Sequence, residues 1–328
     1  MSENTKIEWA THTFNPWEGC TKVSPGCTHC YAETRNHRFG LDNWGKGKPR
    51  RRTSAQNWKL PIQWNRGAQC QCGAAGKPPG ECSFCSAGAN RPRVFCASLA
   101  DVFDEEVPIE WFADLMHLIR RTPNLDWLLL TKRPENFLPR VLWANGHLAS
   151  IGNIENPHTD PYLLTAYMLA DWHNGKPPAN VWMGTSVEDQ KRADERIPKL
   201  LTIPAKVRFL SVEPLLDHVE LYTAAQDPPN PETAPGIDWV IVGGESGPGA
   251  RPCNVEWVRR IVKLCQFIPV PVFVKQVGSN AWLPPGELEA RRSKPCYKPL
   301  THPKGGDMSE WPEDLRVREF PTCKLGDV

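Results

Sequence analysis

The sequence of 328 residues lacks long apolar runs, and no stretch of about 18 consecutive apolar residues is present to serve as a membrane-spanning helix. The opening residues, Met1 to Lys6, lack the apolar stretch of a secretory signal peptide. Formal net charge is only +2, which by itself argues neither for nor against a nucleic-acid partner. With 40% hydrophobic and 23% charged residues, the composition predicts a folded, cytoplasmic protein that does not contact membranes.

The motifs of catalytic zinc enzymes are also missing. No H-E-x-x-H string occurs, and no H-x-E string is followed by the P-C-x-x-C that completes a deaminase signature. A zinc hydrolase or deaminase is therefore disfavoured.

Cysteine, by contrast, is abundant, with twelve in the chain. Without a secretory signal the chain should meet a reducing compartment, where cysteines point to metal chemistry more than to disulfides. Cys20, Cys27 and Cys30 stand at a C-x6-C-x2-C spacing, and glycine and proline between them predict a loop. Three thiolates with no obvious fourth suit a 4Fe-4S cluster with one open iron. An open iron is what a radical enzyme needs to chelate and reduce S-adenosylmethionine.

Two alternatives remain for this triplet. With His29 the three cysteines could bind structural zinc, because C-x2-C is a common half-site. His29 lies between Cys27 and Cys30, too close in sequence to join both comfortably in a tetrahedron. Two of the cysteines could instead form a disulfide, which the expected reducing compartment disfavours.

The chain resembles an uncharacterised phage and bacterial family described as radical-SAM-like, with a long gap between its first two cysteines. The resemblance spans nearly the whole sequence. It is carried by the cysteine loop and by the strings LLLTKRPEN (128–136), GTSVE (184–188), SVEPL (211–215), GGESG (243–247), KGGD (304–307) and EWPEDLRVRE (310–319).

Short apolar runs alternate with helical patterns from residue 93 onward, which predicts an α/β protein with a parallel sheet. We expect strands at 93–99, 127–131, 180–187, 207–212, 238–242 and 270–274, and helices at 31–39, 108–121, 188–201 and 255–267. These units fit a partial (β/α)6-type barrel, the core that the resemblance also implies, and a doubly wound open sheet is the competitor. Residues 1–279 would form this core, interrupted at about 42–92 by an insertion and at about 144–179 by a second insertion or lid. Residues 280–328 would form an extension packed on it.

Polar residues follow every predicted strand, at the edge where α/β proteins bind ligands. By likeness to radical-SAM enzymes, Ser98 to Asp101 would face the methionyl amino group, Ser186 and Glu188 the ribose, and Gly243 and Gly244 the adenine. Candidates for cofactor or substrate are Ser211 and Glu213, and candidates for substrate are Lys132, Arg133, Glu245, Lys275 and Gln276. Tyr31 either contacts the cofactor or packs ordinarily. The glycines taken alone could simply form a tight turn.

The inserted segment 66–92 holds Cys70, Cys72, Cys82 and Cys85 at a C-x-C-x9-C-x2-C spacing. Two close pairs favour a structural zinc knuckle, with a second iron–sulfur cluster as the alternative. Just before it, the run 45–52 ends in Arg50, Arg51 and Arg52 and is flanked by Trp44 and Trp58. This run is either a solvated face or a contact to a nucleic-acid backbone.

Together these observations predict a radical S-adenosylmethionine enzyme that cleaves its cofactor to a 5′-deoxyadenosyl radical, which would act on a nucleic acid or nucleotide. Its partners would include an electron donor such as flavodoxin or ferredoxin. The alternative is a zinc-containing nucleic-acid-binding protein without catalysis.

Overall fold

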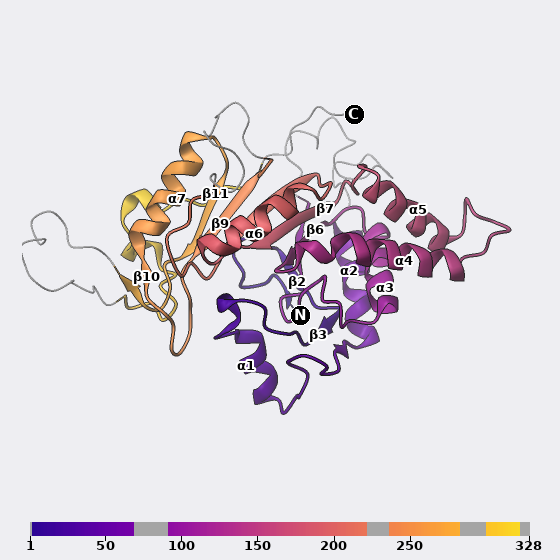
Figure 1. The fold of residues 1–328 in the computed structure, drawn as a ribbon, viewed down its shortest axis with the longest axis horizontal. Coiled ribbons are helices and arrows are strands. Elements are labelled where there is room, and N and C mark those ends of the chain that lie inside the picture. Colours follow the sequence, from indigo (N-terminus) through magenta and orange to yellow (C-terminus); the bar gives the residue numbers. More distant parts are fainter. Residues whose placement is uncertain (1, 69–90, 222–235, 283–299, 322–328) are drawn as a thin grey trace, which may run out of the picture. The chain divides into compact units, whose positions relative to one another are not determined.

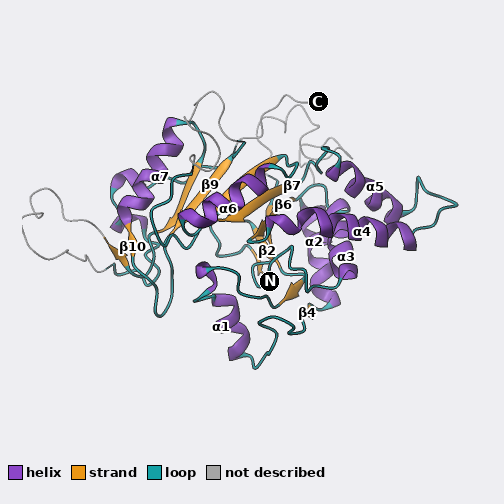
Figure 2. Ribbon diagram, viewed as in Figure 1, coloured by secondary structure: helices purple, strands orange, loops and turns teal. Residues whose placement is uncertain are grey.

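The computed structural model describes residues 2–68, 91–221, 236–282 and 300–321, in which strands and helices alternate (Figure 1, Figure 2). Contacts divide the chain into two units, which do not coincide with the predicted boundary at residue 279. Unit 1 comprises Met1–Lys22, Ala32–Met183 and Thr202–Lys206, and unit 2 comprises Val23–Tyr31, Gly184–Leu201 and Val207–Val328. Strand β7 (Val181–Ser186) crosses from one to the other.

The strands of unit 1 are β1 (Ser2–Glu3), β2 (His12–Phe14), β5 (Arg93–Cys96) and β6 (Asp126–Thr131), in that order. β1 is antiparallel to β2, whereas β2, β5 and β6 are parallel. Phe14 and Trp127 meet edge to face at 5.6 Å in the core of this unit, a contact worth about 1 kcal/mol beyond the area it buries. A short antiparallel ribbon joins β3 (Trp17–Glu18) to β4 (Arg51–Arg52).

Unit 1 has helices both before and after the inserted cysteine segment in the sequence. Helix α1 (Tyr31–Arg38) follows the cysteine loop, and α3 (Ile109–Arg120) buries Phe112, Leu115, Met116 and Ile119 on one face, as their spacing predicts. Helix α2 (Ala55–Gly67) was not predicted, because it lies in the expected insertion and carries Pro61 in its interior. The Ser54 hydroxyl caps it by accepting from the Asn57 N–H at 3.4 Å.

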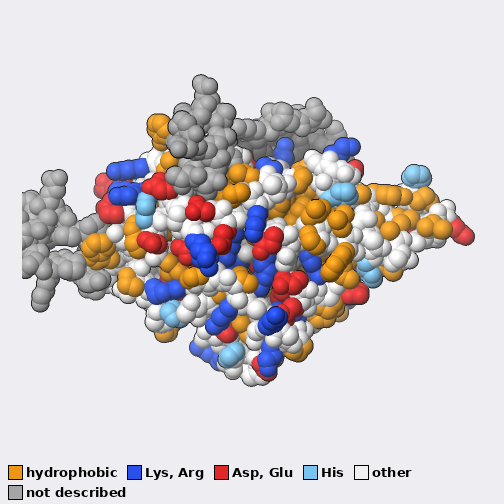
Figure 3. Space-filling model, in the orientation of Figure 1, with side chains coloured by type: hydrophobic (Ala, Val, Ile, Leu, Met, Phe, Trp, Pro, Cys, Tyr) orange, Lys and Arg blue, Asp and Glu red, His pale blue; other side chains and the backbone are white. Residues whose placement is uncertain are grey.

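The second predicted insertion, at about 144–179, is largely helical. Helices α4 (Phe137–Ile151) and α5 (Pro161–His173) pack side by side (Figure 1). The Asp160 carboxylate caps α5 by accepting from the N–H groups of Tyr162 and Leu163. Trp143 on α4 and Ile154 in the loop between the two helices are exposed. Figure 3 shows orange side chains gathered over this part of the molecule.

Unit 2 repeats the alternation with β8 (Val207–Val212), β9 (Trp239–Gly243) and β11 (Val272–Gln276), all parallel. The helices are α6 (Gln190–Leu201) and α7 (Val255–Phe267), and a two-stranded ribbon pairs β10 (Cys253–Asn254) with β12 (Ala281–Trp282). Glycine is required at 184, because a Cβ there would lie 2.3 Å from the Phe209 ring.

Residues 300–321 pack on the strands of unit 2. They contain the 3-10 helices η4 (Met308–Glu310) and η5 (Glu313–Leu315). The Val274 N–H donates to the Val317 carbonyl at 2.9 Å, and the Phe320 ring lies 5.6 Å from Trp239 and 5.3 Å from Phe273.

The α/β class and the parallel strands are thus confirmed, while closure into a partial barrel stays a prediction. Among the described residues, no helix is long and apolar enough to cross a bilayer.

Candidate functional site

The backbone around Cys20 is fixed on both sides. Gly19 adopts a φ of 108°, and a Cβ at this position would lie 2.3 Å from the Asn43 carbonyl oxygen. The Gly19 N–H donates to the Leu99 carbonyl at 3.1 Å, and the Gly45 N–H donates to the Cys20 carbonyl at 2.8 Å. Cys20 is therefore presented from a loop with little freedom.

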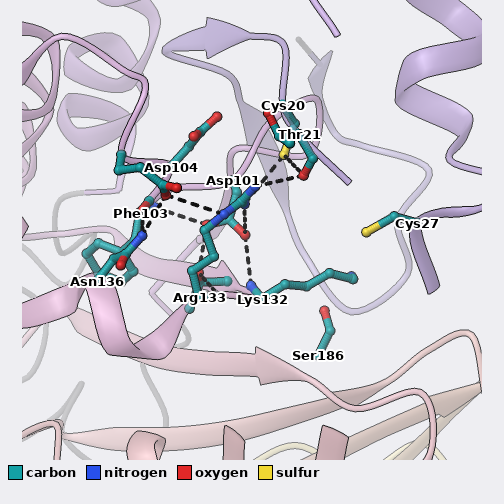
Figure 4. A network of polar contacts seen from close by, with 12 residues as sticks. Cys20, Thr21, Cys27, Asp101, Phe103, Asp104, Lys132, Arg133, Asn136 and Ser186 are labelled. Atoms are coloured by element: carbon teal, nitrogen blue, oxygen red, sulfur yellow. Dashed lines mark hydrogen bonds and ion pairs between the residues drawn. The ribbon is translucent and has the colours of Figure 1, made fainter. Parts of the chain in front are cut away.

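Arg133, predicted to bind substrate, is instead an internal partner of the Cys20 loop (Figure 4). Its side chain is only 5% exposed. One amino group donates to the Thr21 carbonyl at 2.7 Å, and the other lies 3.6 Å from the Cys20 Sγ and 3.2 Å from the Asp101 carboxylate. In this conformation its donors are taken up within the chain, so the guanidinium is not available to the predicted substrate.

Asp101 is the carboxylate that holds Arg133. Its oxygens also accept from the Thr131 hydroxyl at 2.6 Å, the Lys132 N–H at 2.8 Å and the Phe103 N–H at 3.0 Å. The side chain of Lys132 points away from this carboxylate (Figure 4). Both carboxylate oxygens of Asp101 already accept hydrogen bonds from residues of unit 1. Neither is therefore available to the methionyl amino group that was predicted to bind there.

Arg50 is likewise buried, and its predicted contact to nucleic acid is wrong. Its side chain is 0% exposed and pairs with Asp104 at 2.8 Å and Glu106 at 3.1 Å. It donates to the Thr21 hydroxyl at 2.9 Å, so it braces the same loop as Arg133. The neighbouring arginines are exposed but paired, Arg51 with Glu18 at 2.6 Å and Arg52 with Asp114 at 2.7 Å.

Burial and charge act in opposite directions on Cys20. Burial raises the pKa of the thiol to about 12, although the Arg133 guanidinium beside it acts to lower that pKa. For Arg133, burial alone would lower the pKa, but the negative charges of Asp101 and Asp104 outweigh it and raise the pKa. The thiol is protonated at neutral pH unless a cation replaces the proton, as a metal ion does.

In unit 2 the segment that carries Cys27 and Cys30 is held by Glu188. The Glu188 carboxylate is fully buried, accepts from the Gly26 N–H at 3.4 Å and pairs with Arg196 at 2.8 Å. A Cβ on Gly26 would lie 3.0 Å from the Glu188 carboxyl carbon. The prediction that Glu188 binds ribose hydroxyls is wrong, because no part of it is exposed.

Glu245 holds the same segment from the end of β9. It accepts from Arg251 at 2.5 and 2.9 Å and from the His29 ring at 3.1 Å. Arg251 also donates to the Pro25 carbonyl at 3.0 Å. Burial would raise the pKa of Glu245, but the hydrogen bonds from Arg251 and His29 outweigh it and lower that pKa to about 2. Glu245 is thus a structural anion rather than the predicted substrate contact.

A less buried cluster lies at the ends of β8, β9 and β11. Lys275 pairs with Glu213 at 3.0 Å, and the Ser211 hydroxyl donates to Glu213 at 3.4 Å. Gly243 leaves room for this carboxylate, because a Cβ there would lie 2.7 Å from its oxygen. The Gln276 amide donates to the Gly244 carbonyl at 3.2 Å. The structure therefore brings all six of these predicted residues together.

The other predicted residues have varied surroundings. The Ser98 hydroxyl hydrogen-bonds with the Asn15 amide at 3.0 Å, Ser186 is buried and Tyr31 is 61% exposed. Residues 218–220 have the H-x-E spacing of a zinc deaminase. The side chains of His218 and Glu220 are at least partly exposed, and they bond to each other. Cys70, Cys72, Cys82 and Cys85 lie outside the described residues.

Reasoning from sequence missed the internal cations and amides that complete these networks. Arg196 and Arg251 each neutralise a carboxylate at a strand end, and Asn15 orders the turn after β5 by accepting from the Leu99 N–H at 2.8 Å. The only available signal was an excess of carboxylates at strand ends that would need cations if buried.

The three cysteines of the triplet are free thiols. Cys20 in unit 1 and Cys27 and Cys30 in unit 2 are half-buried, and within the described residues none of them is in a disulfide, which contradicts the disulfide alternative. In the same residues, no group of three or more His, Cys, Asp or Glu side chains is arranged to hold a metal ion. Thiols of this kind are the usual ligands of iron–sulfur centres.

Comparison with known proteins gives the family. A family model described as a protein of unknown function (DUF5131) matches residues 4–298. The chain belongs to this family. No curated protein matches the chain, and no solved structure matches it. The family of this chain is therefore an uncharacterised one, as the resemblance implies.

Proposed function

We propose that the family member described here is a radical S-adenosylmethionine enzyme with a radical-SAM-like partial barrel. Cys20, Cys27 and Cys30 would hold a 4Fe-4S cluster. When bound, such a cluster supplies the electron that cleaves the cofactor's sulfonium. The substrate would be a nucleic acid or nucleotide, the electron donor a flavodoxin or ferredoxin, and the place of action the cytoplasm.

The observation that carries this proposal is the way buried charges converge on the two cysteine segments. Arg133 and Arg50 both donate to Thr21, next to Cys20. In unit 2, Glu188 accepts from the Gly26 N–H and Arg251 donates to the Pro25 carbonyl, so both bind the backbone just before Cys27. Such buried networks cost desolvation, so they are expected where a loop must be held in one conformation.

Each set of residues would then have a distinct task. The ion pairs Arg133–Asp101, Arg196–Glu188 and Arg251–Glu245 would position the thiols. The partly exposed Glu213 and Lys275 supply a carboxylate and an ammonium group that can contact the polar groups of a ligand.

Anaerobic reconstitution with iron and sulfide, followed by dithionite and S-adenosylmethionine, tests the proposal. We expect 5′-deoxyadenosine to form with the intact chain and to be absent with Cys27→Ala. The matched control is Cys265→Ala, which removes a buried thiol of α7 away from the triplet. A colourless protein that binds zinc at all of its cysteines and forms no 5′-deoxyadenosine would contradict the proposal and favour the non-catalytic zinc protein.

A further inference from the structure

A groove of about 740 Å³ lies on unit 1 between helices α2 and α3. One wall is a single stripe of α2, formed by Ala55, Lys59, Ile62, Gln63 and Arg66. The facing stripe of α3 consists of Asp114, His117 and Leu118, with Arg121 just after the helix. Both sets follow the i, i+3, i+4, i+7 spacing of one helix face, so the groove runs along the two helices.

The groove is basic at its rim. Lys59, Arg66 and Arg121 are exposed, and Arg52 closes one end. Asp114 is the one acidic residue among those that line it, and it is already paired with Arg52 at 2.7 Å. The lining therefore carries a net positive charge, in contrast to the interspersed positive and negative charges on the face shown in Figure 3.

The floor of the groove is apolar and partly aromatic. Trp58, Ile62 and Leu118 contribute to it, and the Arg52 guanidinium lies 4.4 Å from the centre of the Trp58 ring. A cationic rim above an apolar floor suits a strand of nucleic acid, because the cations can contact its phosphates while its bases pack on the apolar side chains. From Lys59 to Arg66 the helix rises about 10 Å, which spans more than one nucleotide of a strand.

We propose that this groove binds a single-stranded nucleic acid, with Lys59, Arg66 and Arg121 on its phosphates and the Trp58 floor against its bases. The concave form favours a flexible single strand over a duplex, which would reach only the rim. This site deepens the proposed function because it names the form of nucleic acid that the enzyme would take. The binding itself requires neither cluster nor cofactor, so the two proposals can fail separately.

Fluorescence anisotropy with a labelled single-stranded DNA 20-mer and its RNA equivalent, at several salt concentrations, tests the site on the full chain. The variant is Lys59→Gln/Arg66→Gln/Arg121→Gln, and the matched control is Lys176→Gln/Lys191→Gln/Lys263→Gln, three exposed lysines outside the groove. We expect the groove variant to bind at least about tenfold more weakly at low salt. The variant loses three cations, and each phosphate contact contributes about 0.7 to the slope of log K against log[salt]. This slope should therefore be shallower by about 2. The control should behave as wild type.

Equal weakening of both variants would show non-specific charge attraction and overturn the proposal, as would unchanged binding by the groove variant. Tighter binding of duplex than of single strands, or groove-dependent binding to phosphatidylserine vesicles without binding to the 20-mers, would also overturn it. Circular dichroism of each variant checks the fold, and a variant that does not fold is replaced by Lys59→Gln and Arg121→Gln singly. Cofactor cleavage measured without nucleic acid reports separately on the proposed function.

Discussion

At the scale of single residues, most charges that follow the strands are partners of other charges in the chain. Arg133 spans Asp101 and Thr21, and Arg50 spans Asp104 and Thr21, each from a buried position. A guanidinium suits this task because its planar fork donates to several acceptors at once. In unit 2, the strand-end pairs Lys275–Glu213 and Arg251–Glu245 each combine an ion pair with partial exposure of the cation.

Arg133→Met should lower the free energy of unfolding by about 3 kcal/mol, because it leaves the buried Asp101 carboxylate without its cation. Arg133→Lys should restore less than half of this loss, since an ammonium cannot reach Thr21 and Asp101 together as the guanidinium does. Urea unfolding of the cluster-free protein measures both. A decrease in the free energy of unfolding below about 0.5 kcal/mol for Arg133→Met would show that the Arg133–Asp101 pair does not stabilise the fold.

Asp126 at the start of β6 should make stability depend on pH. Burial raises the pKa of this carboxyl to about 6, although Arg91 and Arg93 oppose the rise. Because the pKa is about 3.9 in the unfolded chain, the carboxyl contributes its full stability below about pH 4 and loses it as pH rises through 6. Asp126→Asn should therefore gain stability relative to wild type between pH 4 and pH 7, by about 3 kcal/mol at most. Thermal unfolding at both pH values measures the gain, and an unchanged difference between the two proteins would contradict it.

At the scale of elements, the sequence predicted the strands and helices of the repeating α/β part but not the helices of the insertions. β6, β8 and α7 lie within a residue or two of their expected positions, because apolar runs and an amphipathic face mark them clearly. Helices α2 and α5 were missed, since Pro61 interrupts the first and apolar residues lie all around the second. The partners of the strand-end charges could not be predicted either, because pairing depends on which loops meet at the sheet edge.

Gly19→Ala should disturb the loop that presents Cys20 more than Gly47→Ala disturbs its own turn. Both glycines have positive φ, but a Cβ at 19 would collide with the Asn43 carbonyl at 2.3 Å, whereas nothing lies within 4 Å of one at 47. We expect Gly47→Ala to cost about 1 kcal/mol and Gly19→Ala to cost at least twice that and to lower iron retention. Urea unfolding and iron analysis check this, and equal effects would contradict it.

At the scale of the whole molecule, the chain divides into two units. Each unit has its own core and its own set of charges around its cysteine segment. The 4Fe-4S cluster that we propose would stabilise the protein, because it would bind only the folded chain.

Deleting residues 300–328 should destabilise unit 2, because it removes Phe320 from Trp239 and Phe273 and leaves the edge of β11 without the Val317 carbonyl. Loss of such buried aromatic packing costs about 3 to 5 kcal/mol. Thermal unfolding followed by tryptophan fluorescence measures it. A truncated chain that unfolds at the wild-type temperature would show that this segment contributes nothing to the core.

The most direct test of the central claim is metal and sulfide analysis of anaerobically purified protein and of Cys20→Ala, Cys27→Ala, Cys30→Ala and the control Cys265→Ala. The account predicts about four irons and four sulfides per chain in the wild type and the control, with zinc bound in addition at the inserted cysteines. Each triplet variant should lose the iron and sulfide and keep the zinc. Zinc alone in the wild type, or iron that all three triplet variants retain, would contradict the account.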